Sequence, residues 1–547
     1  MLARVAALLL CGLTFPMFAA TFTVTNPVIG INTGPGTLHQ AILDANANPG
    51  RDQIVFAVAF ATTDPSLPPI TDAVDIDGTF EGSDADVIPS GAIEGVVLFR
   101  FSAGSSTSTL RDLDVALAAP AVRVESGVTG VVIAGNRFMG QVQIFGDDNT
   151  LGGTTAADAN TGFFAIRVDG NGNDLLRNST SGGLITAFGA PNTVIGTVGN
   201  GNTTPSITLI DSPGSVIEGN NIGSGGVGIG SDDVIVRNNV IGGTVTVARS
   251  GLVLVTGVAI TGNSITSSGL AIDLHANGPT PNDGAPDADP GDNGFQNFPV
   301  LTSASLTPGA LTVTGTLATT PLTPYQIELF SNDAANPDAR TLLDSFTAST
   351  DAAGNLTFTR TITSPLPVAG EVITSTATNR GLLPTGTGFP NSTSEVSAPI
   401  ALALPGGLGF ESPTYTVDED AGTVTITVTR TGGDEGTVTV NYATTDGSAT
   451  APADYTETSG TLTFGPGVTE QTFTVPIVQD LQPESDETFT ITLSGPTGGA
   501  TLINATTTVA ITGSAIGAAA VPTVSEWALM VLALGLGLFA VKAVRYL

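Results

Sequence analysis

Apolar residues recur along residues 52–298 at a spacing close to 20 residues, each followed three positions later by a turn position. Seven such pairs lie 18 to 25 residues apart, namely Ile133/Asn136, Leu151/Thr154, Leu175/Asn178, Ile195/Val198, Ile217/Asn220, Ile235/Asn238 and Ile260/Asn263. A solenoid produces this spacing because each coil stacks the same short strand above the last. The repeat predicts stacked parallel strands whose Val-Ile pairs face the core, with a ladder of turn amides at Asn136, Asn178, Asn220, Asn238 and Asn263.

A single helical pattern precedes the repeat. The segment TFTVTNPVIG at residues 21–30 has the pattern of a strand, and residues 36–46 then place Leu38, Ala41, Ile42 and Ala45 at helical spacing. The segment Asn48-Pro49-Gly50 stops that pattern. We therefore expect a strand and one short helix to open the solenoid.

After residue 298 the period changes. Residues 299–403 hold short alternating segments separated by Pro, Gly, Asn and Asp, which predict an antiparallel β-sandwich. The segment LPGGLG at residues 404–409 predicts a linker, and residues 410–511 predict a second sandwich of seven strands. The chain is therefore expected to be all-β, with domains at 21–298, 299–403 and 409–513.

Charge and composition exclude several classes of function. The chain has 16 Lys and Arg against 49 Asp and Glu, a net charge of −33, and its only lysine is Lys542. Binding of a polyanion such as nucleic acid by a basic surface is therefore not expected. The only cysteine, Cys11, lies in the N-terminal segment, so after its removal no disulfide or thiol chemistry is expected.

Both ends of the chain have the pattern of membrane-directed segments. Arg4 precedes an apolar run from Val5 to Leu13, and Ala19 and Ala20 close a segment that predicts an export signal over residues 1–20, cleaved near Ala20. The site is imperfect, because Met17 or Phe18 stands where a small residue is preferred. Residues 527–541 are apolar and precede Lys542 and Arg545, which predicts a transmembrane helix with a cytoplasmic C-terminus.

A short motif stands immediately before this C-terminal helix. It reads Val521, Pro522, Thr523, Val524, Ser525, Glu526 and Trp527. The motif, apolar segment and basic end resemble the IPTL-CTERM sorting tails of Gram-negative bacteria, which are similar to PEP-CTERM tails. The resemblance implies that the exported protein is addressed to a sorting enzyme in the inner membrane.

The solenoid also resembles a known family. Residues 36–48 are similar to the capping segment that opens many exported bacterial β-helix proteins, and residues 271–301 resemble the ending "IDLG…TPND…N…QNFPVL" of many bacterial surface proteins. The strand and asparagine repeat looks like the right-handed parallel β-helix of the pectate-lyase type. Residues 299–403 resemble the Ig-like module that often follows such β-helices.

Residues 410–511 closely resemble a Calx-beta domain. The resemblance is carried by TVDEDAG at 416–422, YATTDGSA at 442–449, ADY at 453–455 and SGTLTFGPG at 459–467. It implies calcium ligands in loops at one end of the sandwich, at Glu419, Asp454, Asp480, Glu484 and Glu487. Gln479 and the segment Thr512-Gly513-Ser514 depart from the acidic residues of the family, so a calcium site and a metal-free sandwich both remain open.

Two other acidic groups are candidates for chemistry. Asp232 and Asp233, with Arg237 and Arg249 nearby, are the best pair for sugar cleavage. Neighbouring strand residues point to opposite faces, however, and an Asp-Asp pair at a turn is ordinarily a solvated corner. The loop with Asp283, Asp287, Asp289 and Asp292 could offer oxygen ligands to calcium or could be a solvated loop.

The sequence therefore predicts an exported, envelope-associated structural or adhesive protein of a Gram-negative bacterium. We expect it to present its β-helix to carbohydrate or to partner proteins, at least transiently anchored in the inner membrane. We assign no catalytic residues and expect no enzymatic activity. The alternative is a polysaccharide-processing lyase or hydrolase built on the same solenoid.

Overall fold

The computed structural model describes residues 20–27, 34–58, 60–63, 67–80, 83–89, 97–116, 120–162, 164–249, 254–287, 290–381, 391–479 and 484–513. They form two compact units, residues 1–304 with 312–402 and residues 305–311 with 403–547. The expected signal segment before Ala20 and the expected tail at 521–547 lie outside the described residues. Within the described ranges, no helix has the length and hydropathy needed to cross a membrane.

A short cap opens the first unit as the sequence predicted. Strand β1 (Thr21–Val24) pairs in parallel with β2 (Asp52–Phe56), and helix α2 (Leu38–Ala47) lies between them in the chain. The Thr37 hydroxyl accepts a hydrogen bond from the Gln40 N–H at 3.2 Å and so caps the helix. The buried residues of α2 are the four that the helical spacing predicted: Leu38, Ala41, Ile42 and Ala45.

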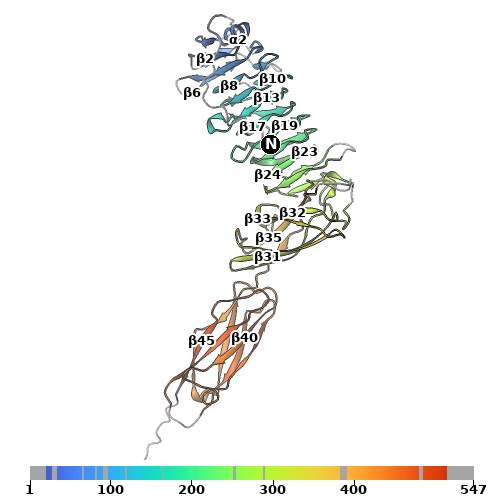
Figure 1. The fold of residues 1–547 in the computed structure, drawn as a ribbon. Coiled ribbons are helices and arrows are strands. Elements are labelled where there is room, and N and C mark those ends of the chain that lie inside the picture. The colour runs from blue at the N-terminus through green and yellow to red at the C-terminus, as the bar shows by residue number, and fades with distance from the viewer. Residues whose placement is uncertain are drawn as a thin grey trace, which may run out of the picture. The chain divides into compact units, whose positions relative to one another are not determined.

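The β-helix is built from two sheets whose coils stack one on the next (Figure 1). Among the described residues, the eleven-stranded sheet holds β1, β2, β4 (Val74–Asp77), β8 (Thr109–Arg111), β11 (Val132–Ala134), β14 (Thr150–Gly152), β17 (Asp174–Leu176), β20 (Val194–Ile195), β22 (Val216–Glu218), β24 (Ile235–Arg237) and β27 (Ala259–Thr261). Its neighbouring strands pair in parallel, which confirms the parallel solenoid.

The second sheet has eighteen strands within the described ranges. They are β3 (Phe60–Thr63), β5 (Thr79–Phe80), β6 (Ser83–Pro89), β7 (Phe99–Phe101), β9 (Leu113–Val115), β10 (Val122–Val124), β12 (Arg137–Phe138), β13 (Gln141–Ile144), β15 (Thr161–Gly162), β16 (Ala165–Val168), β18 (Ser179–Thr180), β19 (Ile185–Phe188), β21 (Thr203–Ile210), β23 (Asn221–Gly230), β25 (Val240–Ile241), β26 (Val245–Val247), β28 (Ser264–Ile265) and β29 (Ile272–Leu274). Its pairs are parallel except β5 with β6.

One residue of each coil forms a continuous apolar column inside the β-helix. The column runs through Ile133, Leu151, Leu175, Ile195, Ile217, Val236 and Ile260, all buried and in register. The prediction that whole Val-Ile pairs face the core was wrong, because successive strand side chains point to opposite faces. In β24 the core residue is therefore Val236, while Ile235 is half-buried.

A ladder of buried asparagines follows this column. Its members are Asn136, Asn160, Asn178, Asn202, Asn220, Asn239 and Asn263. In a typical step, the backbone N–H and the side-chain amide of Asn178 both donate to Asn202 Oδ1 at 2.9 Å. Because each amide bonds to the next coil, the ladder satisfies buried turn groups along the β-helix.

The sequence predicted four of these asparagines correctly and misplaced the others. Asn238 was wrong: it has a φ of 56° and turns its amide to Glu218, while Asn239 joins the ladder. Asn160 and Asn202 were missed because turns lengthen their coils, one by the 3₁₀ helix η1 (Ala156–Asp158) and one by the turn at 197–200. These insertions move the asparagine away from the position three residues after the core residue.

An antiparallel sandwich follows the β-helix, as expected. One sheet contains β30 (Val300–Thr307), β31 (Ala310–Ala318) and β34 (Asn355–Ile362), and the other contains β33 (Thr341–Ser349), β32 (Pro324–Asp333), β35 (Glu371–Asn379) and β36 (Ile400–Ala401). Phe330 and Ala339 belong to the hydrophobic core of the β-helix, and Ala339 forms a bridge with Ile265. The sandwich is therefore packed against the last coil.

Carboxylates of this sandwich bond to backbone N–H groups at the open end of the β-helix. Both Glu328 oxygens accept from Gly262 N–H at 3.0 Å, and Asp338 accepts from Ser267 N–H at 2.9 Å. Glu395 accepts from Leu274 N–H at 3.0 Å and from Thr280 N–H at 2.7 Å. Burial raises the pKa of all three carboxyls. The acids thus take the place of the carbonyls that a further coil would supply.

The second unit is a separate sandwich. One sheet orders β42 (Glu470–Pro476), β39 (Thr423–Thr431), β37 (Gly407–Phe410) and β44 (Thr501–Leu502), and the other orders β38 (Thr414–Asp418), β45 (Thr506–Thr512), β43 (Glu487–Ser494), β40 (Val438–Thr445) and β41 (Ser459–Phe464). Alternate residues such as Ile426, Val440 and Ile491 fill its core. Among the described residues this sandwich has nine strands, two more than the seven predicted, and the short strands β37 and β44 account for the difference.

The asparagine ladder gives a direct test of β-helix stability. We expect Asn202→Ala to lower the free energy of unfolding of the first unit by about 3 kcal/mol, because it leaves several buried donors and acceptors unpaired. Asn202 is fully buried, and its amide donates to Leu175 and Asn220. Denaturant unfolding of the full chain measures the change, with exposed Asn355→Ala as the control. Equal stability of the two variants would contradict the role given to the ladder.

Candidate metal centre

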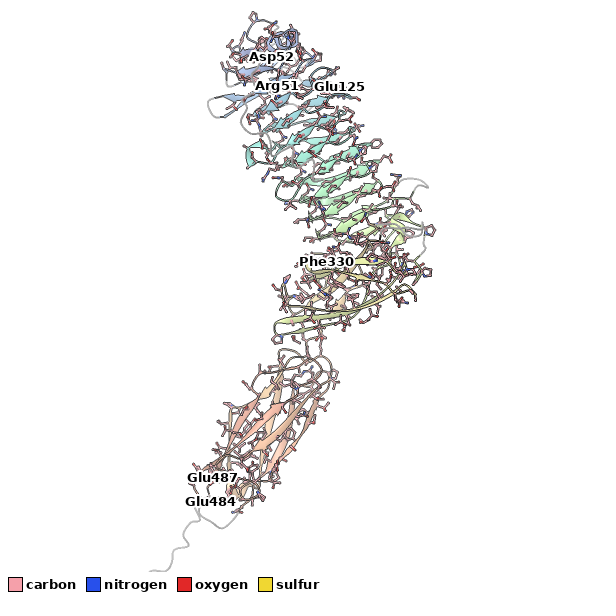
Figure 2. All side chains as sticks on the ribbon, viewed as in Figure 1. Arg51, Asp52, Glu125, Phe330, Glu484 and Glu487 are labelled. Carbon is pink, nitrogen blue, oxygen red and sulfur yellow. The ribbon has the colours of Figure 1, made fainter. Side chains whose placement is uncertain are left out.

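Three carboxylates meet at one end of the second unit. Oxygen atoms of Asp454, Glu484 and Glu487 all lie within 4.8 Å of one another. Each of the three side chains is half-buried. Figure 2 shows Glu484 and Glu487 together at that end of the sandwich. These are three of the five ligand positions that the sequence predicted.

Glu487 is positioned by the core of the sandwich. It is the first residue of β43, and the alternation of the strand places it on the same face as buried Phe489, Ile491 and Leu493. The column of apolar side chains therefore ends in a carboxylate where the strand reaches the loops. Burial, and next the nearby charge of Asp454, raise the pKa of Glu487.

Asp454 is held by a tight turn and by its neighbour in the chain. Its Oδ2 accepts from the Thr450 N–H at 2.7 Å, while its own N–H donates to the Thr450 carbonyl at 2.9 Å. Tyr455 stacks on Phe489 with ring centroids 4.1 Å apart and donates its hydroxyl to Asp446 at 2.6 Å. Burial together with this bond to Asp446 raises the pKa of Tyr455 to about 12. The stack fixes Asp454 beside the strand that carries Glu487.

Residues 512–514, where this chain lacks the acidic residues of Calx-beta domains, lie next to Glu484. A Cβ atom at Gly513 would lie 2.1 Å from the Glu484 carbonyl oxygen, so a larger residue does not fit there without a shift. The Gly513 N–H donates to Asp486 at 3.3 Å, and the Thr512 hydroxyl donates to Asp418 at 2.6 Å. Where the family has acids, this chain therefore has groups that donate to neighbouring carboxylates.

The other predicted ligands have different positions. Glu419 lies buried in the 3₁₀ turn η3 (Glu419–Ala421) after β38 and is not part of the group of three. Asp480 lies outside the described residues, and Gln479 is exposed. The structure therefore offers three carboxylates that could hold a hard cation, which needs six to eight oxygen ligands in the case of calcium.

The acidic loop before residue 299 does not gather its carboxylates within the described residues. Buried Asp292 accepts from Val255 N–H at 2.6 Å and bonds to His275 Nδ1 at 2.7 Å. Asp287 accepts from Asn297 N–H at 2.9 Å, and Asp283 accepts from the Asn297 amide at 3.0 Å. Asp289 lies outside the described ranges. These acids hold the end of the β-helix together.

The possible catalytic pair is also bound to structural partners. Asp232 accepts from Thr256 N–H at 2.8 Å, and Asp233 has a φ of 54° in the same corner. Arg249 lies 3.1 Å from Asp211 and 3.8 Å from Asp232. Arg237 binds Glu218 at 2.9 Å, a partner that the sequence analysis missed because it lies one coil earlier.

One outer wall of the β-helix carries a row of arginines that the sequence analysis did not identify. Arg100, Arg123, Gln143 and Arg167 pair in register on four successive strands of the second sheet. Arg123 donates to Gln143 Oε1 at 2.8 and 2.6 Å, and its guanidinium lies 5.2 Å from the centre of the Phe145 ring. Their spacings of 23, 20 and 24 residues lie within the range of the repeat, but the sequence analysis followed only its apolar and turn positions.

Two family models match the second sandwich and the C-terminal segment. The Calx-beta domain model matches residues 404–515, and the IPTL-CTERM motif matches residues 519–545. Sodium/calcium exchanger 1 of Canis lupus familiaris and sodium/calcium exchanger 3 of Homo sapiens are each 45% identical over 86 residues. Each match covers 16% of this chain and 9% of the relative, so the chain spans about a tenth of the length of these curated relatives.

Two solved structures also resemble parts of the chain. The apo-form Calx CBD1 domain is 37% identical and covers 20% of this chain and 96% of its own, with a TM-score of 0.19. The enzymatically active domain of bacteriophage CBA120 tailspike protein 4 is 11% identical and covers 66% of this chain and 67% of its own, with a TM-score of 0.21. With its β-helix, Calx-beta domain and IPTL-CTERM motif, the chain has the composition of an exported, envelope-associated surface protein.

Proposed function

We propose that this protein is a calcium-binding surface protein retained in the envelope of a Gram-negative bacterium. The group of Asp454, Glu484 and Glu487 carries the proposal. Calcium is a hard cation that prefers carboxylate and carbonyl oxygens in flexible loops, which is what this end of the sandwich offers. Calcium also stands in the names of the exchangers that match the domain.

Calcium should stabilise the Calx-beta unit of the full chain. A cation that binds only the folded unit stabilises it by about 2.7 kcal/mol at a hundredfold excess over the dissociation constant. We expect millimolar calcium to raise the melting temperature of this unit and Glu487→Gln to remove most of the gain. Since the pKa of Glu487 is raised, protons should compete with calcium and reduce the gain as the pH falls through that pKa.

Differential scanning calorimetry with and without a chelator measures this gain. Glu470→Gln is the matched control, because Glu470 is an exposed acid of strand β42 in the same sandwich. If calcium left the melting temperature of the unaltered chain unchanged, the three carboxylates would not hold the ion without the acids that this chain lacks.

We propose that the C-terminal tail retains the protein in the envelope through a sorting enzyme of the inner membrane. The family match to residues 519–545 and the basic end with Lys542 and Arg545 support this. Replacing Pro522 and Thr523 by Ala should leave export intact and change the fraction of protein kept in the envelope, because the motif is read after translocation. Cell fractionation with immunoblotting measures it. An unchanged distribution in the same processed form would argue against sorting.

We further propose that the arginine wall of the β-helix binds an acidic polysaccharide, which would make the protein adhesive. Arg100 lies 3.5 Å from Glu125, and Arg167 lies 2.7 Å from Asp169. The Arg123 hydrogen bonds go to a neutral amide, so three arginines and two carboxylates leave the wall one positive charge in a chain of −33. Arginine binds carboxylates through two parallel hydrogen bonds, which suits uronate groups.

Two aromatic rings extend this wall. Phe145 follows Ile144 and lies under Arg123 and Arg167, with the ring centre 5.2 and 5.8 Å from the guanidinium carbons. Phe188, 48% exposed, is the corresponding residue two coils further on. Because parallel strands lie about 4.8 Å apart, the two rings are separated by roughly 10 Å along the β-helix. That spacing favours an extended polymer over a single small sugar.

Binding of immobilised pectate or alginate to the mature chain tests this role. We expect the double variant Arg123→Gln/Phe188→Ala to lower the affinity about tenfold, because one uncompensated charge and one stacking surface are lost. Arg360→Gln is the control, since Arg360 stacks on Phe346 at 4.6 Å in the adjoining sandwich. Equal binding by the unaltered chain, the double variant and Arg360→Gln would contradict the proposed role of the arginine wall. We expect no cleavage, and new reducing ends or unsaturated products would favour the enzyme alternative.

A further inference from the structure

A buried carboxylate at the start of the β-helix has an unusual set of partners. Asp52 opens strand β2 and is 0% exposed. Its Oδ1 accepts from the Ala20 N–H at 2.9 Å and from the Asn48 amide at 2.7 Å. Its Oδ2 is buried and has no hydrogen-bond partner among the described residues. Figure 2 shows Asp52 in the first coils, beside the cap.

An unpaired oxygen on a buried carboxylate is costly, and it indicates a missing donor. The neighbouring basic residue does not supply that donor, because Arg51 donates to both oxygens of Asp75 at 2.8 and 2.7 Å. A backbone amide such as that of Ala20 has one N–H and no charge. An α-ammonium at the same atom would have three donors and a positive charge.

Ala20 is a fixed part of the fold. Its carbonyl accepts from the Gln53 N–H at 2.9 Å, and the next residue, Thr21, pairs with Gln53 at the start of the parallel β1–β2 pair. The sequence alone allows cleavage of the export signal after Ala19 or after Ala20. Cleavage after Ala20 would remove both the Asp52 and the Gln53 contacts of that residue.

We propose that the export signal is cut between Ala19 and Ala20 and that the new α-ammonium of Ala20 binds both oxygens of Asp52. Water, delivered by a signal peptidase of the envelope, adds to the Ala19 carbonyl, and the C–N bond to Ala20 breaks. Ala19 leaves as a carboxylate, and the Ala20 amine takes up a proton at neutral pH. Asp52 is thus a receptor for the processed chain end. The inference rests on the export included in the proposed function.

Processing then completes the cap of the β-helix. Before cleavage the Ala20 nitrogen gives Asp52 a single neutral hydrogen bond. After cleavage the same nitrogen forms a buried ion pair, in which the charge of Asp52 is neutralised and its second oxygen is satisfied. The cap is therefore more stable in the exported protein than in its precursor.

N-terminal sequencing and intact mass of the full protein purified from the envelope test the cleavage position. The expected first residue is Ala20. A chain that starts at Thr21 or at any other residue overturns the proposal while leaving export intact. An uncut chain found only in the cytoplasm overturns both the inference and the proposed export.

Amine labelling tests the ion pair, and the composition makes it specific. Lys542 is the only lysine of the chain, so an amine-reactive probe has two targets and peptide mass spectrometry separates them. We expect the Ala20 amine of the processed protein to react at least tenfold faster in Asp52→Asn than in the unaltered chain. Asp44→Asn is the control, because Asp44 is an exposed acid of helix α2 that contacts Gln40 at 2.7 Å.

The Ala20 amine of Asp52→Asn could also be labelled faster because the substitution loosens the cap. A double-mutant thermodynamic cycle separates this effect from loss of the ion pair. Inserting Gly-Ser between Ala19 and Ala20 moves the terminal charge two residues away while Asp52 stays intact. We expect the insertion to lower the melting temperature of the first unit by about 2 °C or more, and to have no further effect when Asp52 is already asparagine. Equal effects in both backgrounds overturn the proposal. If Asp52→Asn does not fold, the insertion alone still tests the proposal. An insertion that leaves the melting temperature of the otherwise unaltered chain unchanged would overturn it.

Discussion

The backbone hydrogen bonds between coils are the interaction on which the first unit depends. Each coil of a parallel solenoid both donates to and accepts from each of its two neighbours, so the interior coils are satisfied and each end coil keeps one side of unpaired backbone groups. The buried asparagine ladder adds side-chain hydrogen bonds from each coil to the next. The structure of both ends follows from the need to satisfy the groups that have no neighbouring coil.

The two ends meet this need in different ways. At the start, a strand and an amphipathic helix cover the first coil, with Asp52 holding the chain where it enters the fold. At the other end, Glu328, Asp338 and Glu395 accept from backbone N–H groups of the last coil. Carboxylates suit this position because each offers two acceptor atoms. All three carboxylates are buried in the contact, and this burial raises their pKa values.

The sequence predicted what depends on local pattern and missed what depends on register. Helix α2, the parallel coils and the two sandwiches were predicted from the spacing of apolar residues and from the turn residues between them. Both patterns can be read locally in the sequence. Asn160 and Asn202 were missed because insertions in their turns changed the spacing. The approach of Asp454 to Glu487 could be predicted only from a family resemblance, since more than thirty residues separate them. The arginine wall was missed because the repeat was followed at its apolar and turn positions and not at its outward-facing ones.

The sandwich on the last coil also limits how copies of the chain can assemble. An exposed strand at the end of a parallel solenoid is a template on which the first coil of another copy could add, and repeated addition would produce a fibre. Here the backbone N–H groups of Ile260 in β27 and Leu274 in β29 donate to Thr393 and Glu395 of the same chain. The N–H of Gly262, directly after β27, donates to Glu328. Because those donors are already used, growth by head-to-tail strand addition is blocked at this end. The sandwich therefore ends the β-helix within the chain itself.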